Sequence, residues 1–400
     1  KTHPCLRQDY ICCGVKDLIS IGKVSFRDKM DIFADLPTHG HKDGANLSKP
    51  NVTDVKVSAN TQVDKKKEDA NSLYQDEVRQ EGGEEETGHL KRRSVNEQGD
   101  EVPAKRLATG MYSLHGYYAE RKGERNEMQD KHVILDDFTP HFSNLPSTVS
   151  RLSFYAVYDG HSGDKASKHA AKTLHKHILD GFPKTETTNR DKEIKKCLIE
   201  TFRVTDEEFL KQASASKPVW KDGSTAVCVL VVDNTLYIAN LGDSKAFLCR
   251  YNPETQKHQF LPLSKDHTPT QYEERMRIQK AGSNVRNGRV MGILEVSRSI
   301  GDGRFKRSGV ICTPDIKKCQ LGDDDRYILL SCDGLWEGFD ADAVMQFTND
   351  ILDGEKVKQS EGKSKDDVLF ETACNRLASE AIRRGSSDNI TVILVNIKKS

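Results

Sequence analysis

Five aspartates each stand at one end of an apolar run that is typical of a β-strand: Asp130, Asp159, Asp243, Asp333 and Asp388. The rigid ends of strands hold short side chains in fixed positions. Several carboxylates gathered on one edge of a sheet repel one another unless a cation neutralises them. Hard oxygen ligands suit Mg²⁺ or Mn²⁺ better than Zn²⁺. The sequence therefore predicts a divalent metal site at a sheet edge.

Two of these aspartates precede a glycine, in Asp159-Gly160-His161 and in Asp333-Gly334. Glycine lets its own carbonyl approach an ion closely. An Asp-Gly pair is also an ordinary turn, and that interpretation suffices for either pair alone. Five aspartates at strand ends favour the metal site instead. His161 is either a general acid or a histidine without a role at a helix start, and its place beside Asp159 favours catalysis.

Apolar periodicity predicts the elements that must position these residues. Strands are predicted at residues 153–158, 225–232, 235–239, 245–250, 327–332 and 390–397. The link Asp233-Asn234 indicates a hairpin between the second and third of them. Helices are predicted over 166–178, 194–202 and about 366–384, with Gly385 as a stop signal. Strands in hairpin-like groups and helices in blocks favour an α+β fold, a mostly antiparallel sheet covered by helices.

The chain is polar for a globular protein, with 30% charged and 36% hydrophobic residues among 400. Residues 38–108 hold almost no apolar runs and cannot bury enough surface to offset their ordering entropy. We therefore predict a disordered polar tail over 30–109 and one domain over 110–400, with a polar loop near 353–365. Met30 resembles a natural start, so residues 1–29 are predicted to be upstream sequence that is not native.

The net charge of zero, with 61 residues of each sign, provides no basic field for nucleic acid. No apolar run approaches the roughly 20 residues that span a bilayer. Ten scattered cysteines favour buried free thiols in a reducing compartment. We expect a monomeric cytoplasmic protein without a membrane partner. Basic clusters at 91–93 and 105–106 fit either a nuclear import signal or a solvated charge run.

Seven motifs follow one another at residues 125–130, 155–161, 222–226, 240–244, 297–302, 332–336 and 387–389. In this order they resemble the motifs of the type-2C (PPM-type), metal-dependent serine/threonine phosphatases. The resemblance extends over about 112–398. It implies a four-layer α-β-β-α sandwich, in which helices flank two mostly antiparallel sheets.

The resemblance also implies the metal ligands. Asp159 would bridge two divalent cations, and the carbonyl of Gly160 would bind one of them. Asp333 and Asp388 would hold the other cation. Asp243, together with Asp333, would form a weaker third site.

The implied substrates are proteins that carry phosphoserine or phosphothreonine. Arg125 would grip the phosphate, which a planar guanidinium does well. Asp130 would orient a water molecule, and His161 would protonate the leaving oxygen. Two Mg²⁺ or Mn²⁺ ions would activate the attacking water, so that no covalent phosphoenzyme forms. By analogy alone, the resemblance also points to the integrin-linked kinase pathway.

Three residues depart from the family pattern. Gln129 stands where the family often has Glu, and Ser162 replaces the usual second glycine after the histidine. Glu337 stands where many relatives have Asp, which weakens the expectation of a third cation more than that of the first two.

Three other functions were weighed against this one. A catalytically weak scaffold with the same fold would lack one of four residues that are all present: Asp159, Asp333, Asp388 and His161. A cysteine phosphatase would use the Cys-x5-Arg pattern of Cys197 and Arg203, but this pattern lies within a predicted helix and lacks glycine. A metal-dependent nuclease would need a basic channel, and the domain has no obvious cluster for one.

Overall fold

The computed structural model describes residues 112–186, 188–354 and 362–399. The predictions for residues 1–29 and for the polar tail lie outside the described residues, as does most of the polar loop near 353–365. Within the described part of the chain, no helix is both long and apolar enough to cross a membrane.

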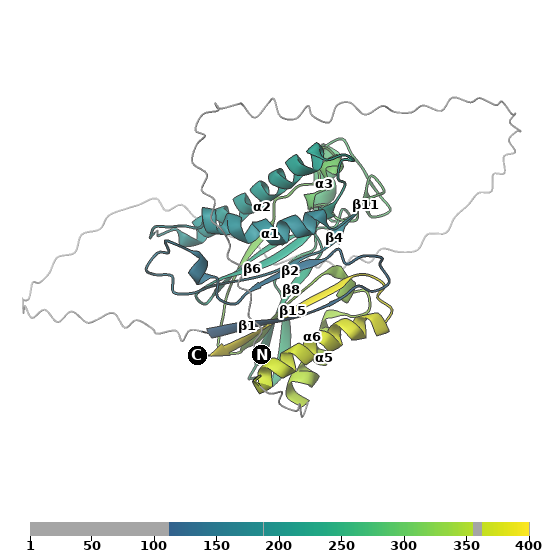
Figure 1. The fold of residues 1–400 in the computed structure, drawn as a ribbon. Coiled ribbons are helices and arrows are strands. Elements are labelled where there is room, and N and C mark those ends of the chain that lie inside the picture. Colours follow the sequence, from purple (N-terminus) through teal and green to yellow (C-terminus); the bar gives the residue numbers. More distant parts are fainter. Residues whose placement is uncertain (1–111, 187, 355–361, 400) are drawn as a thin grey trace, which may run out of the picture. The chain divides into compact units, whose positions relative to one another are not determined.

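Two five-stranded sheets form the centre of the domain (Figure 1). The first sheet has the order β1 (Tyr112–Arg121), β15 (Ile390–Lys399), β14 (Asp325–Ser331), β8 (Lys245–Asn252) and β9 (Lys257–Pro262). The second has the order β13 (Asp315–Gln320), β7 (Thr235–Leu241), β6 (Ala226–Val232), β3 (Leu152–Tyr158) and β2 (Lys131–Leu135). All neighbouring strands in these two sheets run antiparallel.

Helices cover the outer face of each sheet (Figure 1). The teal helices α1 (Lys165–Gly181) and α2 (Arg190–Ala215) share a hydrophobic cluster with the second sheet. The yellow-green helices α5 (Ala341–Gly354) and α6 (Lys365–Arg383) share another with the first sheet. A third cluster fills the space between the sheets. The four-layer sandwich that the resemblance implied is thereby confirmed.

The central strands are buried on both faces because each face meets a different layer. In β3, Phe154 and Ala156 pack toward α1 and α2, whereas Tyr155 and Val157 pack between the sheets. This follows from the two-residue period of a strand. The continuous apolar runs of the sequence therefore mark the middle of the sandwich.

The predicted strands are present with shifts of a few residues at their ends; the third, for example, extends from 239 to Leu241. Strands β1, β9 and β13 and helices α3 (Tyr272–Lys280) and α5 were not predicted from the sequence. Helix α3 is polar, and only Glu274 and Ile278 are buried in it, so it has almost no apolar stripe.

Short elements complete the domain next to these layers. A three-stranded sheet has the order β12 (Ile300–Gly301), β5 (Gly223–Ser224) and β4 (Gly160–His161). A segment formed by α3, β10 (Val285–Arg286), β11 (Arg289–Val290) and α4 (Gly303–Lys306) has a small hydrophobic cluster of its own. We call residues 264–313 the α3–α4 segment. Two 3₁₀ helices, η2 (Thr139–His141) and η3 (Asp333–Leu335), complete the described elements.

Leu174 provides a test of the helix–sheet packing because its side chain is fully buried between α1 and the second sheet. Leu174→Ala should lower the free energy of unfolding by about 2–5 kcal/mol, through lost burial and the cavity left behind. Urea denaturation followed by circular dichroism measures this change. Ile199→Ala is the matched control, since Ile199 is 41% exposed on α2 and its loss should change little. Equal effects of both substitutions would contradict the packing described here.

Candidate active site

The strand register brings four of the predicted site residues to one edge of the sandwich. In the second sheet, the last residue of β3, Tyr158, pairs with the first residue of β2, Lys131. In the first sheet, Ser331 at the end of β14 pairs with Lys245, the first residue of β8. Asp130, Asp159, Asp243 and Asp333 follow or precede these ends by one or two residues. Antiparallel pairing alternates strand starts and ends along an edge, so residues that are far apart in the chain meet there.

Three of the predicted ligands form a cluster. Asp159, Asp243 and Asp333 each offer a carboxylate oxygen, and these oxygens lie within 4.8 Å of one another. They line a pocket of about 370 Å³ together with Gly160 and Asp388. His161 and Arg125 line the same pocket, so seven of the eight residues predicted from sequence share it.

The carboxylates oppose one another's ionisation. Burial, followed by the charges of Asp333 and Asp130, raises the pKa of Asp159 well above its usual value. Burial raises the pKa of Asp243 to about 7, with Asp333 adding to the effect. Burial and the charge of Asp388 likewise raise the pKa of Asp333. A bound cation would lower these raised pKa values, because it stabilises the ionised form of each carboxylate.

Gly160 fits its predicted role through its backbone. A Cβ atom there would lie 2.4 Å from the carbonyl oxygen of Gln129 and 2.7 Å from Oγ of Ser167. The strand end therefore packs too closely for any side chain at this position. Carboxylates and a backbone carbonyl form an all-oxygen donor set, and these residues fit Mg²⁺ or Mn²⁺.

Asp388 lies at the rim of the cluster and forms an ion pair with Arg125, the residue predicted to bind the phosphate. Its Oδ2 accepts a hydrogen bond from Nη2 of Arg125 at 2.7 Å, and its Oδ1 accepts one from the backbone of Asn389 at 2.6 Å. The Arg125 side chain is 57% exposed, so this ion pair is weak and easily exchanged. The predicted metal ligand and the predicted phosphate-binding arginine are thus neighbours.

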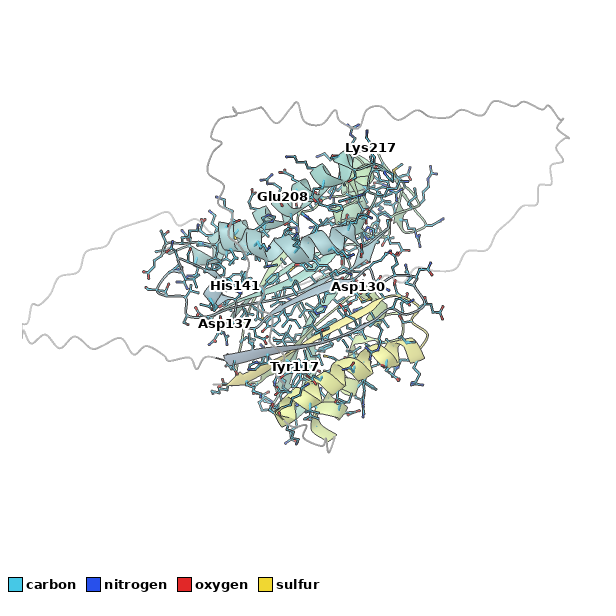
Figure 2. The ribbon with its side chains drawn as sticks, in the orientation of Figure 1. Tyr117, Asp130, Asp137, His141, Glu208 and Lys217 are labelled. Atoms are coloured by element: carbon cyan, nitrogen blue, oxygen red, sulfur yellow. The ribbon has the colours of Figure 1, made fainter. Side chains whose placement is uncertain are left out.

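Asp130 is the predicted site residue that does not line the pocket. It lies at the start of β2 (Figure 2), and its Oδ2 accepts a hydrogen bond from Oγ1 of Thr391 at 2.8 Å. Burial raises the pKa of Asp130 to about 7, although Thr391 and Cys332 oppose the shift. Asp333 and Asp388 are close enough to add to it.

Asn389 holds the loop that carries Arg125, a role that the sequence analysis missed. Its side-chain amide donates to the carbonyls of Lys122 at 2.8 Å and Glu127 at 3.0 Å. Its Oδ1 accepts from the backbone N–H of Gln129 at 2.7 Å. A buried side chain in the motif at 387–389 therefore fixes both ends of the arginine loop.

The structure also pairs His161 with a partner that the sequence analysis missed. Nε2 of His161 lies 2.6 Å from Oδ2 of Asp302, whose side chain is fully buried. The same oxygen accepts a hydrogen bond from Oγ of Ser299 at 2.7 Å. Burial disfavours the charged imidazole, but Asp302 outweighs it and raises the pKa of His161. Because Nε2 faces Asp302, Nδ1 is the nitrogen left for a substrate.

The three-stranded sheet explains why these two residues meet. His161 of β4 and Gly301 of β12 both pair with Gly223 of β5, one from each side. A Cβ on Gly223 would lie 2.2 Å from both Nε2 of His161 and Oδ2 of Asp302. Only a glycine at position 223 leaves room for the hydrogen bond between His161 and Asp302. The Asp-Gly motif at 222–223 was the sequence signal that could have indicated this close contact.

Two departures from the family pattern have a structural consequence. Ser162 adopts a left-handed backbone conformation with φ of 59°, which glycine adopts without strain and other residues at a cost of about 1–2 kcal/mol. Oε2 of Glu337 accepts a hydrogen bond from the backbone N–H of Ser387 at 3.0 Å. Glu337 therefore supports the loop that carries Asp388.

The Cys-x5-Arg pattern does not form a site. Cys197 is buried in α2, and burial raises the pKa of its thiol to about 11. Arg203 is paired with Glu200 and Glu207 on the surface of the same helix. A buried, protonated thiol and a surface arginine that is already paired cannot form a phosphate-binding nucleophilic site.

The chain is similar to several known proteins over most of its length. A family model described as Protein phosphatase 2C matches residues 115–390. An integrin-linked kinase-associated serine/threonine phosphatase 2C from Bos taurus is 51% identical over 374 residues, which cover 92% of this chain and all of the relative. Its Homo sapiens counterpart is 60% identical over 72% of this chain and 73% of its own length. A probable protein phosphatase 2C 8 from Arabidopsis thaliana is 37% identical over 70% and 78% of the two chains.

Solved structures match the fold at lower identity. A serine-threonine phosphatase 2C from Toxoplasma gondii has a TM-score of 0.58 and 19% identity, covering 71% of this chain and 95% of its own. A C. elegans sex determining protein also has a TM-score of 0.58, with 24% identity over 71% of this chain and 65% of its own. These two likenesses support the fold alone.

Removing one ligand tests the carboxylate cluster. Asp333→Asn should weaken Mn²⁺ binding by at least about tenfold, because even the loss of a residue that only hydrogen-bonds a metal ligand lowers metal affinity by that factor. Isothermal titration calorimetry on chelator-treated protein measures the affinity. The same substitution should not destabilise the chelator-treated protein, since it removes one of several repelling charges. The exposed Asp180→Asn on α1 is the matched control. Unchanged Mn²⁺ affinity in Asp333→Asn would remove Asp333 from the site.

Proposed function

The chain belongs to the protein phosphatase 2C family, and we propose that its site hydrolyses phosphoserine and phosphothreonine with two divalent cations and without a covalent phosphoenzyme. The observation that carries this proposal is the meeting of Asp159, Asp243 and Asp333 in one pocket with Arg125 and His161. This is a serine/threonine protein phosphatase, and its substrates are phosphorylated proteins.

The residues divide the metal binding among them. Asp159, the Gly160 carbonyl, Asp333 and Asp388 would hold two Mg²⁺ or Mn²⁺ ions, and Asp243 with Asp333 would hold a weaker third. When bound, the two ions supply an activated water that attacks phosphorus in line, which makes a covalent intermediate on the protein unnecessary.

Three residues handle the substrate and its protons. Arg125 is exposed enough to turn from Asp388 to the phosphate, where its planar guanidinium can donate two parallel hydrogen bonds. Asp130, fixed by Thr391, would accept a hydrogen bond from the attacking water. His161 would protonate the leaving seryl or threonyl oxygen through Nδ1, while Asp302 holds the ring and favours its protonated form.

Two further proposals, on the signalling pathway and on the location in the cell, rest on names and sequence patterns and not on the geometry of the site. The integrin-linked kinase association belongs to the names of the mammalian relatives, and by that likeness alone we propose that this phosphatase acts in the same pathway. A cytoplasmic location, with a nuclear pool directed by the basic clusters at 91–93 and 105–106, is proposed from the sequence.

Phosphate release from a phosphothreonine peptide tests the proposed function. The full-length protein should release phosphate with Mn²⁺, lose this activity in excess chelator and regain it when Mn²⁺ is restored. Asp159→Asn should abolish turnover because one shared ligand supports both ions, whereas the control Asp180→Asn should retain it. A scaffold that only binds phosphoproteins would release no phosphate under any of these conditions, and that result would overturn the proposal.

The proton-donor role of His161 requires a test that separates it from metal binding. Alkyl phosphates such as phosphothreonine leave as strongly basic alkoxides, whereas p-nitrophenyl phosphate leaves as a weak base that needs little help. His161→Gln should therefore slow turnover of the phosphothreonine peptide by about 10²–10⁴-fold and that of p-nitrophenyl phosphate much less.

Asp302→Asn should produce the same imbalance between the two substrates, to a smaller extent, because Asp302 acts only by holding His161. Both variants are measured at saturating Mn²⁺. Equal losses on the two substrates would leave His161 and Asp302 as structural residues and would contradict the acid role.

A further inference from the structure

The active-site pocket is lined by three arginines, and they differ in their partners. Arg125 is paired with Asp388, and Arg289 of β11 is paired with Glu295, another pocket residue. Arg304 of α4 forms no ion pair with a carboxylate among the described residues. It is therefore the one pocket arginine in the described structure whose charge is free to meet an anion from outside.

Arg304 is held in place although its charge has no partner. Its guanidinium carbon lies 4.6 Å from the centre of the Phe305 ring, and Phe305 is buried in the cluster of the α3–α4 segment. A guanidinium stacked by one face on an aromatic ring keeps its N–H groups free at its edges. Because its side chain is already held in place, Arg304 loses less conformational entropy when it binds an anion than a fully mobile arginine would lose.

Arg304 shares the pocket with His161, the residue proposed to protonate the leaving oxygen. Only Gly303 separates it from Asp302, the residue that holds His161, and His161 serves the leaving oxygen. The leaving oxygen belongs to the side chain of the substrate's own serine or threonine. The substrate residues on either side of that serine or threonine must therefore pass along the part of the pocket that Arg304 and His161 line. The pocket lining also includes the apolar residues Ile293, Leu294 and Val296, and Ile293 is 53% exposed.

We propose that Arg304 is a specificity residue that binds an acidic side chain, Asp or Glu, next to the phosphorylated residue of the substrate. This inference rests on the proposed phosphatase function, because it assigns a substrate class to the same pocket. The preferred substrates are then phosphoserine and phosphothreonine sites with acidic neighbours. The contact forms before the chemical step and persists through it, so it should lower KM and leave kcat nearly unchanged.

Matched phosphothreonine peptides that differ only in the flanking residues test this proposal. One peptide carries Asp on both sides of the phosphothreonine, a second carries Asn and a third carries Lys. The wild-type protein with Mn²⁺ should favour the Asp peptide over the Asn peptide by about three- to tenfold in kcat/KM, as expected for one partly exposed charge pair. Most of that difference should lie in KM.

Three variants assign the preference to Arg304. Arg304→Gln should remove the preference for Asp over Asn, and Arg304→Glu should shift it toward the Lys peptide. Arg275→Gln is the matched control, because Arg275 is exposed on α3, in the same segment, and does not line the pocket. This control should keep the wild-type ratio between the peptides.

The outcomes separate this inference from the proposed function. Equal kcat/KM for the Asp and Asn peptides in the wild type would overturn the inference and leave the phosphatase function intact. A preference that survives in Arg304→Gln would assign the contact to another residue and also overturn it. An absence of Mn²⁺-dependent turnover on all three peptides would overturn the proposed function, and the inference with it.

Discussion

Repulsion among half-buried carboxylates is the constraint on which the rest of the domain depends. Asp159, Asp243 and Asp333 would separate if their backbones were free, because neighbouring carboxylates raise the pKa of each: Asp333 acts on Asp159 and Asp243, and Asp388 acts on Asp333. They are instead attached to strands that are buried on both faces, where moving one aspartate would require unpacking the sandwich. Packing energy thus holds the carboxylates together in an arrangement that could bind a cation.

The loops around the cluster are held in place by hydrogen bonds and by close backbone packing. Asn389 fixes the arginine loop by three hydrogen bonds, and Gly123 in that loop, with φ of 62°, packs against the carbonyl of Asp388. The residues proposed for phosphate binding and for metal binding, Arg125 and Asp388, therefore share one contact between 122–129 and 387–389. A substitution in either segment should disturb both, although the two lie more than 250 residues apart in sequence.

The sequence was sufficient for the parts of the site that local patterns encode. An aspartate at the end of an apolar strand can be recognised from a few neighbouring residues. The apolar runs predicted an antiparallel sheet covered by helices, whereas the four-layer sandwich was predicted from the family resemblance. Asp302 and Asn389 could not be assigned in this way, because their roles depend on partners such as His161, 141 residues away. Helix α3 was missed because ion pairs and short-range contacts, rather than an apolar stripe, hold most of it in place.

The α3–α4 segment shows how substrate specificity can change while the chemistry is kept. Its inner residues are anchored: Glu274 is buried, and although burial opposes its charge, Arg277, Arg298 and Ser297 hold its pKa well below the usual range. Asp302 belongs to this anchored part, and its geometry has little freedom. Arg304, only two residues later, is exposed and supports no other contact than its stacking on Phe305. Replacing Arg304 changes the charge that the pocket offers to a substrate and leaves the contact between Asp302 and His161 in place. The residue that supports catalysis therefore precedes α4, and the proposed recognition residue lies within it.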